Sequence, residues 1–185
     1  MEGVMRTGNE KDELLAKSEV SLILDSYEDI FSNFDPRHYS QRSLSVDFLD
    51  EAKRATREMG DSLELRFLLP LSKRKIEVEN VVKKRLREHF KKHHERLEKE
   101  KRKISNQGIY FVLAGFFFMF FAAYILFFYA EKSFWYGFLV VLLEPGGWFL
   151  FWEGLDLMIF ESKKIKPDLE FYRKMQNAEI VFSHY

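Results

Sequence analysis

Residues 108–152 decide the fold of this chain: GIYFVLAGFFFMFFAAYILFFYAEKSFWYGFLVVLLEPGGWFLFW. The stretch holds two apolar segments joined by a short link that carries Glu131 and Lys132. The segment 108–129 has no charged residue, and it is long enough as a helix to cross a hydrocarbon core of about 30 Å. We therefore expect two antiparallel transmembrane helices, within a hairpin that covers residues 104–165.

The second apolar segment poses a problem of length. If it ran from 134 to 160 as one span, it would submerge three carboxylates: Glu144, Glu153 and Asp156. We expect a shorter span over 134–152, with Trp135 and Trp152 at the two interfaces. Residues 153–165 would continue as an interfacial helix. Only Glu144 then lies deep in the bilayer.

The basic residues predict the orientation. Lys and Arg crowd the sequence before residue 108 and return after residue 160, whereas the link between the spans has a single Lys. The positive-inside rule then places both termini in the cytoplasm, with the hairpin in the cell or inner membrane. Residues 1–17 lack the basic and apolar regions of a secretory signal, so we expect a mobile arm there.

The composition limits the chemistry that the chain can perform. Its 185 residues allow one modest soluble domain beside a small membrane part. The formal net charge is zero, but most of the charged residues lie outside residues 108–160 and most of the 20 Phe lie inside that range. The absence of cysteine excludes disulfides, thiol nucleophiles, iron–sulfur clusters and Cys-type zinc sites. We expect no cofactor.

Residues 18–103 predict a small cytosolic α/β domain. A strand over 19–25 and an alternating strand over 62–69 flank an amphipathic helix that begins after Ser43 or Ser45 and reaches Met59. That order suggests one right-handed βαβ crossover. We expect the loop between the first strand and the helix to be anchored by four side chains: Tyr27, Ile30, Phe31 and Phe34.

The rest of the chain completes an α+β membrane protein with the order β-α-β-α-TM-TM-β. A long helix from about Lys75 runs without a breaker into the first span. In the cytosolic tail, 166–185, we expect a short helix over 169–175 and a terminal strand able to join the soluble sheet.

The motif around Glu144 is the strongest candidate for a functional site: Glu144, Pro145, Gly146, Gly147 and Trp148. An ionisable group near the bilayer centre is costly and often marks function. The structural alternative is a protonated Glu144 that hydrogen-bonds backbone groups freed where Pro145 breaks the helix. The seven-residue spacing of Gly108, Gly115 and Ala122, and of Gly147 and Gly154, predicts close helix packing, within the hairpin or between subunits.

Three weaker candidates lie outside the spans. One loop gathers Asp29, Asp35, Arg37, His38 and Tyr39, as an active site or as a turn tied by hydrogen bonds. A basic helix face favours anionic lipid headgroups over nucleic acid: Lys91, Lys92, Lys99, Lys101, Arg102 and Lys103. Weak metal candidates are Glu153 with Asp156, and His89 with His93, although packing or solvation is the expected role of the His pair.

The stretch Leu143-Glu144-Pro145-Gly146-Gly147-Trp148-Phe149, with the upstream Tyr27-Glu28-Asp29-Ile30-Phe31 and Phe34-Asp35-Pro36-Arg37, resembles a family of uncharacterised prokaryotic proteins with two membrane spans. The resemblance implies a two-span protein with a cytosolic domain and carries over no catalytic residue.

No catalytic signature appears in the sequence, so we expect an integral membrane scaffold, adaptor or sensor rather than an enzyme. Its expected partners are the bilayer, anionic headgroups, further copies of itself and an unidentified protein. Two alternatives stay open. One is a small oligomeric ion or proton channel that uses Glu144 and a broken second span. The other is a membrane-associated enzyme with a divalent metal.

Overall fold

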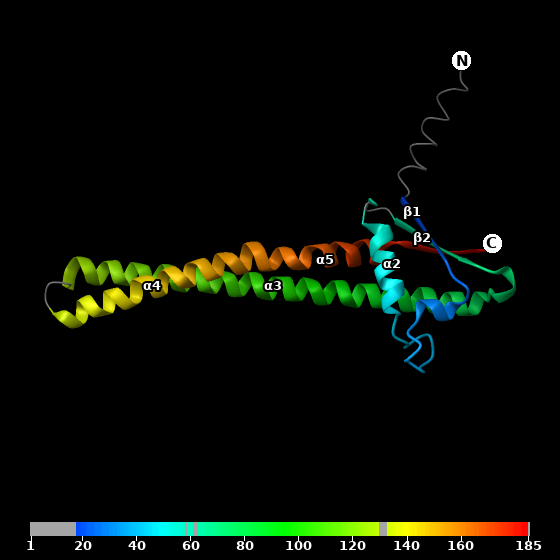
Figure 1. Cartoon of the computed structure of the whole chain (residues 1–185), viewed down its shortest axis with the longest axis horizontal. Helices are drawn as coiled ribbons and strands as arrows, with labels where there is room; N and C mark the ends of the chain where they lie inside the picture. The colour runs from blue at the N-terminus through cyan, green and yellow to red at the C-terminus, as the bar shows by residue number, and fades with distance from the viewer. Residues whose placement is uncertain (1–17, 58, 61–62, 130–132, 185) are drawn as a thin grey trace, which may run out of the picture. The chain divides into compact units, whose positions relative to one another are not determined.

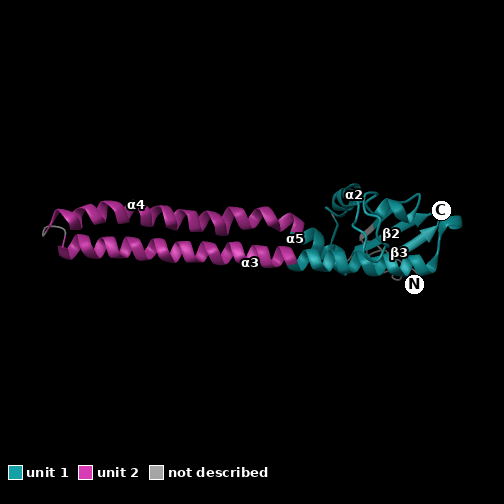
Figure 2. Cartoon of the chain, turned by 90° about the horizontal axis from the view of Figure 1, so that it is seen from below, with its two compact units in different colours: residues 1–95, 169–185 teal, residues 96–168 magenta. Residues whose placement is uncertain are grey.

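The structure is a computed structural model, which describes residues 18–57, 59–60, 63–129 and 133–184. It is mostly helical, with a small three-stranded parallel sheet and two long apolar helices (Figure 1). Contacts divide the chain into two units, residues 1–95 with 169–185 and residues 96–168 (Figure 2). The expected mobile arm over 1–17 and most of the link between the spans lie outside the described residues.

The sheet of the first unit is built from segments far apart in sequence. Strands β1 (Ser18–Ile23), β2 (Leu63–Leu69) and β3 (Glu179–His184) follow the order β1-β2-β3, and both pairings are parallel. This confirms the predicted crossover pairing of the first two strands and the terminal strand that joins them. The strands therefore tie the last residues of the chain into the N-terminal domain.

One face of the sheet forms the core of this unit. Residues on β2 alternate between buried and half-buried, as a strand covered on one face requires. Phe67 packs against Phe182 of β3 and Phe48 of α2 (Val46–Thr56), at ring-centroid distances of 5.2 and 5.9 Å. The fully buried residues of α3 (Ile76–Tyr129) are Val82, Leu86 and Phe90, which recur every four residues and so share one face of the helix.

Two details of the first unit differ from the prediction. Helix α2 ends at Thr56 and not at Met59, and the fully buried Thr56 continues the face of Phe48 and Ala52 because its hydroxyl donates to the carbonyl of Ala52, at 2.8 Å. The prediction for Phe34 is wrong, since 98% of this residue is exposed. The loop is instead anchored by residues of the 3₁₀ helix η1 (Tyr27–Ile30) and by Phe31, which bridges to Leu44.

In the second unit, α3 and α4 (Phe134–Asp156) run side by side (Figures 1 and 2). Two helical runs, Ile76–Tyr129 and Phe134–Asn177, each contain a window long and apolar enough to cross a membrane. Only 17% and 11% of the residues in these windows are buried. Such exposure differs from that of a core helix in a soluble protein and fits two spans that face lipid.

The predicted break in the second span is wrong. Helix α4 passes through Pro145 without interruption, because a proline removes one intrahelical hydrogen bond and the neighbouring bonds persist. The helix also does not stop near residue 165. A π-helical turn, η4 (Leu157–Glu161), connects α4 to α5 (Ser162–Asn177), which contains Pro167 and replaces the short helix expected over 169–175. The 3₁₀ turn η2 (Leu71–Lys73) precedes α3.

Candidate functional site

The two apolar helices meet along a seam of glycines. A Cβ atom on Gly108 would lie 2.8 Å from the carbonyl oxygen of Gly154, and one on Gly115 would lie 2.6 Å from that of Gly147. These contacts leave no room for a side chain, so the backbones touch. Of the two packings predicted for these residues, the structure shows the one within the hairpin.

Beyond the glycines the seam opens into a cavity. Continuing the seven-residue register places Ala122 opposite Val140, and both are buried. There the two helices border a partly open cavity of about 550 Å³, lined by Met119, Ala122, Ala123, Leu126, Val140, Glu144, Pro145 and Trp148. The small side chains of Ala122 and Ala123 leave the space that larger residues would fill. The cavity combines an apolar wall with a single carboxylate.

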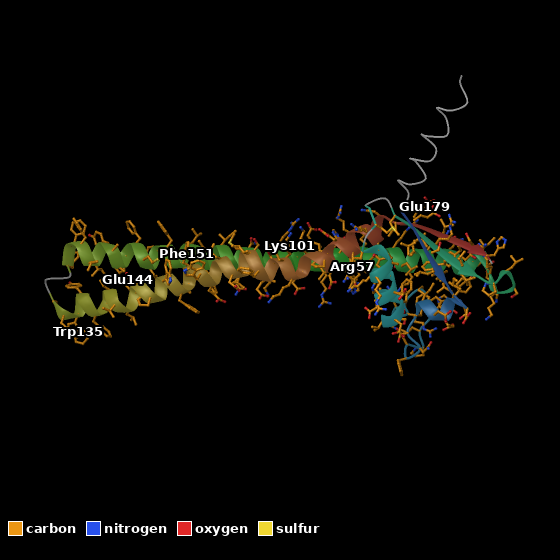
Figure 3. All side chains as sticks on the ribbon, turned by 45° about the horizontal axis from the view of Figure 1, so that its top comes forward. Arg57, Lys101, Trp135, Glu144, Phe151 and Glu179 are labelled. Atoms are coloured by element: carbon orange, nitrogen blue, oxygen red, sulfur yellow. The ribbon has the colours of Figure 1, made fainter. Side chains whose placement is uncertain are left out.

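Glu144 lies in the middle of α4, between Trp135 near its start and Phe151 towards its end (Figure 3). Its side chain is exposed at the cavity. In the part of the chain that the structure describes, Glu144 has no hydrogen bond or ion pair. The backbone hydrogen bonds expected for a structural Glu144 are therefore not formed, and the carboxylate is available to another molecule.

The remaining residues of the motif take different positions. Pro145 and Trp148 line the same cavity as Glu144, whereas Gly147 belongs to the glycine seam. Gly146 belongs to neither, since a Cβ atom on it would meet nothing within 4 Å. The motif thus combines a packing residue with three cavity residues. Ala122 and Ala123 complete the site: the sequence pattern predicts only a packing role for Ala122 and gives no signal for Ala123.

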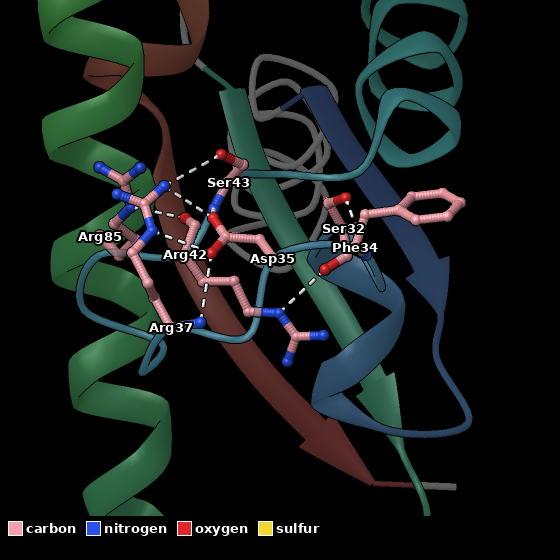
Figure 4. Close-up of polar contacts among 7 residues, drawn as sticks. All are labelled: Ser32, Phe34, Asp35, Arg37, Arg42, Ser43 and Arg85. Carbon is pink, nitrogen blue, oxygen red and sulfur yellow. Dashed lines mark hydrogen bonds and ion pairs between the residues drawn. The ribbon is translucent and has the colours of Figure 1, made fainter.

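The loop candidates form a hydrogen-bonded turn, of which Figure 4 shows Asp35 and Arg37 with their neighbours. Arg37 donates two hydrogen bonds to Asp35, at 2.9 and 2.7 Å, and Ser43 N–H donates to the same carboxylate at 2.7 Å. These contacts hold the pKa of Asp35 well below its usual range. Asp29 accepts from the backbone N–H groups of Asp25 and Ser26 and so caps η1.

The other loop residues are also engaged. The Tyr39 hydroxyl donates to Glu28 at 2.5 Å, and Glu28 is paired with Arg42. Burial and the neighbouring Glu28 raise the pKa of Tyr39 to about 12. The His38 ring lies 3.2 Å from the Ser40 hydroxyl. Because these acids and bases contact one another, the arrangement fits a tied turn better than an open catalytic centre.

The His pair packs against a residue that the sequence did not reveal as its partner. The rings of His89 and His93 stack at 4.0 Å, and Tyr172 of α5 stacks on His93 at 5.2 Å. His89 is buried, and its Nε2 atom has no hydrogen-bond partner among the described residues. Burial lowers the pKa of His89 to about 4, and the nearby His93 and Arg85 add to this effect.

The basic candidates divide between the two units. A groove of about 470 Å³ on α3 is lined by Lys99, Arg102, Lys103, Asn106, Gln107 and Tyr110. Lys91 and Lys92 lie in the other unit, and Lys101 does not line the groove. Amide and phenol groups beside three cations suit an anionic headgroup with hydrogen-bond acceptors.

Glu153 and Asp156 share a smaller groove of about 280 Å³ with aromatic and aliphatic side chains. Within the described ranges, no group of three or more His, Cys, Asp or Glu could hold a metal ion. This pair supplies only two side-chain ligands.

Comparison of the chain with protein-family models, with curated proteins and with solved structures found no match. The resemblance to a two-span family therefore remains a prediction, and the candidate site rests on its own geometry.

Proposed function

We propose that the protein is an integral membrane scaffold, adaptor or sensor that holds its α/β unit at the cytoplasmic face and self-associates. The observation that supports this proposal is the continuity of its helices. Helix α3 contributes to the core of the first unit and ends at Tyr129, and the run Phe134–Asn177 returns to β3. A ligand or partner of the hairpin would thus act on helices that also build the soluble core, which is the arrangement a membrane sensor needs.

The membrane location and orientation can be tested by cysteine labelling, because the chain has no native cysteine. We expect Ser133→Cys, beside the link between the spans, to react with an impermeant maleimide added outside intact cells. Asn33→Cys, in the soluble loop, should react only after the membrane is permeabilised. Labelling of Asn33→Cys from outside, or of neither variant under any condition, would overturn the proposed topology.

Self-association needs a separate measurement. The glycine seam is already filled within one hairpin, so contacts between copies would use the outer aromatic faces of the spans. Light scattering of the detergent-solubilised chain should give the mass of two or more copies. A single-chain mass at every concentration would refute this part of the proposal.

A second candidate function is an ion or proton pathway, and the unpartnered Glu144 at the cavity favours it. Reconstituted protein should then carry a proton or cation flux that falls in Glu144→Gln. An equal flux in both proteins would exclude a pathway through Glu144.

A further inference from the structure

The cavity beside Glu144 has the properties of a small-molecule site. Its volume of about 550 Å³ lies in the range of roughly 300–1,000 Å³ that holds small ligands. Seven of its eight lining residues are apolar or aromatic, and Glu144 is the one charged residue. An occupant therefore needs an apolar body and one group complementary to a carboxylate.

An ionised carboxylate at Glu144 would need a cationic partner, which the apolar segments of the hairpin do not supply. Residues 108–129 and 134–152 contain no Lys, Arg or His. A second copy of the hairpin packed into this cavity would bring its own Glu144 and no cation from its spans. Charge complementarity thus favours a separate cationic molecule over a second copy.

Trp148 adds an aromatic wall to the same side. It follows Glu144 by four residues on α4, so both side chains lie on one face of the helix, and 55% of Trp148 is exposed. An indole face attracts organic cations through its quadrupole. A bare Ca²⁺ or Mg²⁺ ion suits the cavity poorly, since each takes six or more oxygen ligands and Glu144 offers two.

We infer that this cavity binds a lipophilic organic cation, with its apolar body between Ala122, Ala123 and Leu126 and its charge between Glu144 and Trp148. The inference rests on the proposed membrane location, and it does not require self-association. Binding of the cation stabilises an ionised carboxylate in the apolar layer, where an unpaired charge costs free energy.

The test uses the full chain in nanodiscs of zwitterionic phosphatidylcholine, with equilibrium dialysis against empty nanodiscs. The probe is tetraphenylphosphonium, and tetraphenylborate, of similar shape and opposite charge, is its control. We expect one tetraphenylphosphonium per chain and no specific binding of tetraphenylborate. Glu144→Gln should weaken cation binding at least about tenfold, because it removes the negative charge that attracts the phosphonium in a layer of low dielectric constant.

Three variants separate the possible outcomes. Ala123→Leu should abolish binding by filling the cavity without altering its charge, and Trp148→Leu should weaken it severalfold. Glu153→Gln serves as the matched control, since Glu153 lies on the same helix outside this cavity. This variant should bind the probe as tightly as the unmodified chain does. Equal binding by Glu144→Gln, or equal binding of both ions, would overturn the inference.

A chain that inserts with the expected cysteine-labelling pattern but binds no cation would overturn only this inference. If, in addition, Ala123→Cys forms disulfide-linked dimers in the membrane, the cavities of two copies face each other in place of a bound cation. Failure of insertion itself would instead overturn the proposed function.

Discussion

Gly115 and Gly147 bring the backbones of the two apolar helices into direct contact. A Cβ atom on Gly115 would lie 2.6 Å from the carbonyl oxygen of Gly147 and 2.5 Å from the amide nitrogen of Phe151. Both neighbours are backbone atoms, which cannot rotate away as a side chain could. The position therefore requires glycine for close approach, and the seam should be sensitive to a single methyl group.

We expect Gly115→Ala to destabilise the hairpin by about 1–3 kcal/mol, because the helices must separate to admit the methyl group. The intrinsic preference of a helix for alanine, about 1 kcal/mol, opposes this effect and does not cancel it. Thermal unfolding in one detergent would measure the difference. The matched control is Gly146→Ala, where a Cβ atom meets nothing within 4 Å. Equal destabilisation by both variants would refute the close backbone contact at Gly115.

Much of this seam could be predicted from the sequence. The seven-residue spacing of small residues on both limbs indicated one packed face, and the parallel pairing of the first two strands followed from the order strand, helix, strand. The pairing of Gly115 with Gly147 could not be predicted, since it depends on the length and geometry of the link. The cavity could not be predicted either, because it arises only when Ala122 and Ala123 face Glu144, which again depends on how the two helices pair.

Other features depend on contacts between distant residues. Tyr172 stacks on His93 only because α5 and β3 return to the first unit, and no local pattern connects these residues. The predicted break at Pro145 is wrong because unpaired backbone groups are costly in an apolar layer, and this cost outweighs the local tendency of proline to end a helix. The hydrophobicity of Phe34 predicts burial, but polar contacts hold its loop and leave the side chain exposed.

A buried ion pair in the first unit offers a test of stability. Glu79 is 6% exposed, accepts hydrogen bonds from Arg74 at 2.8 and 3.1 Å, and accepts one from Tyr27 at 3.3 Å. We expect Glu79→Gln to lower the free energy of unfolding by about 1–3 kcal/mol at neutral pH, because Arg74 loses its charged partner. Denaturant unfolding of the full chain would measure this loss. Glu77→Gln, on the exposed side of the same turn, should have little effect.

The same pair predicts a response to acid. Arg74, the largest cause, lowers the pKa of Glu79 from its ordinary 4.5. The stabilisation is therefore complete above about pH 4.5 and is lost as the pH falls through the lower, folded-state pKa. Glu79→Gln should show a smaller loss of stability in this acid range. An unchanged acid response would show that other groups govern it.

His89 predicts a second response at higher pH. Its pKa falls from 6.5 to about 4 on folding, chiefly through burial, so the unfolded chain binds a proton that the folded chain does not. Stability should be greatest above pH 6.5 and should decrease by about 1–3 kcal/mol as the pH falls from 6.5 towards 4. His89→Phe should flatten this part of the profile, whereas His94→Gln should leave it unchanged. The unfolding free energy measured between pH 7 and 5 separates the effect of His89 from that of Glu79, since Glu79 contributes mainly below that range.

The groove at Lys99, Arg102 and Lys103 predicts selective retention of anionic lipid. Each basic residue near a headgroup contributes about 1 kcal/mol, and Arg102 should contribute least because it already pairs with Glu98 at 2.7 Å. Replacing all three by Gln should therefore weaken phosphatidylglycerol binding by roughly 2 kcal/mol, about thirtyfold. Native mass spectrometry from micelles containing phosphatidylglycerol and phosphatidylcholine would measure the retained lipid. Lys91→Gln with Lys92→Gln is the control outside the groove, and an equal loss in both proteins would indicate general charge attraction instead of a lipid site.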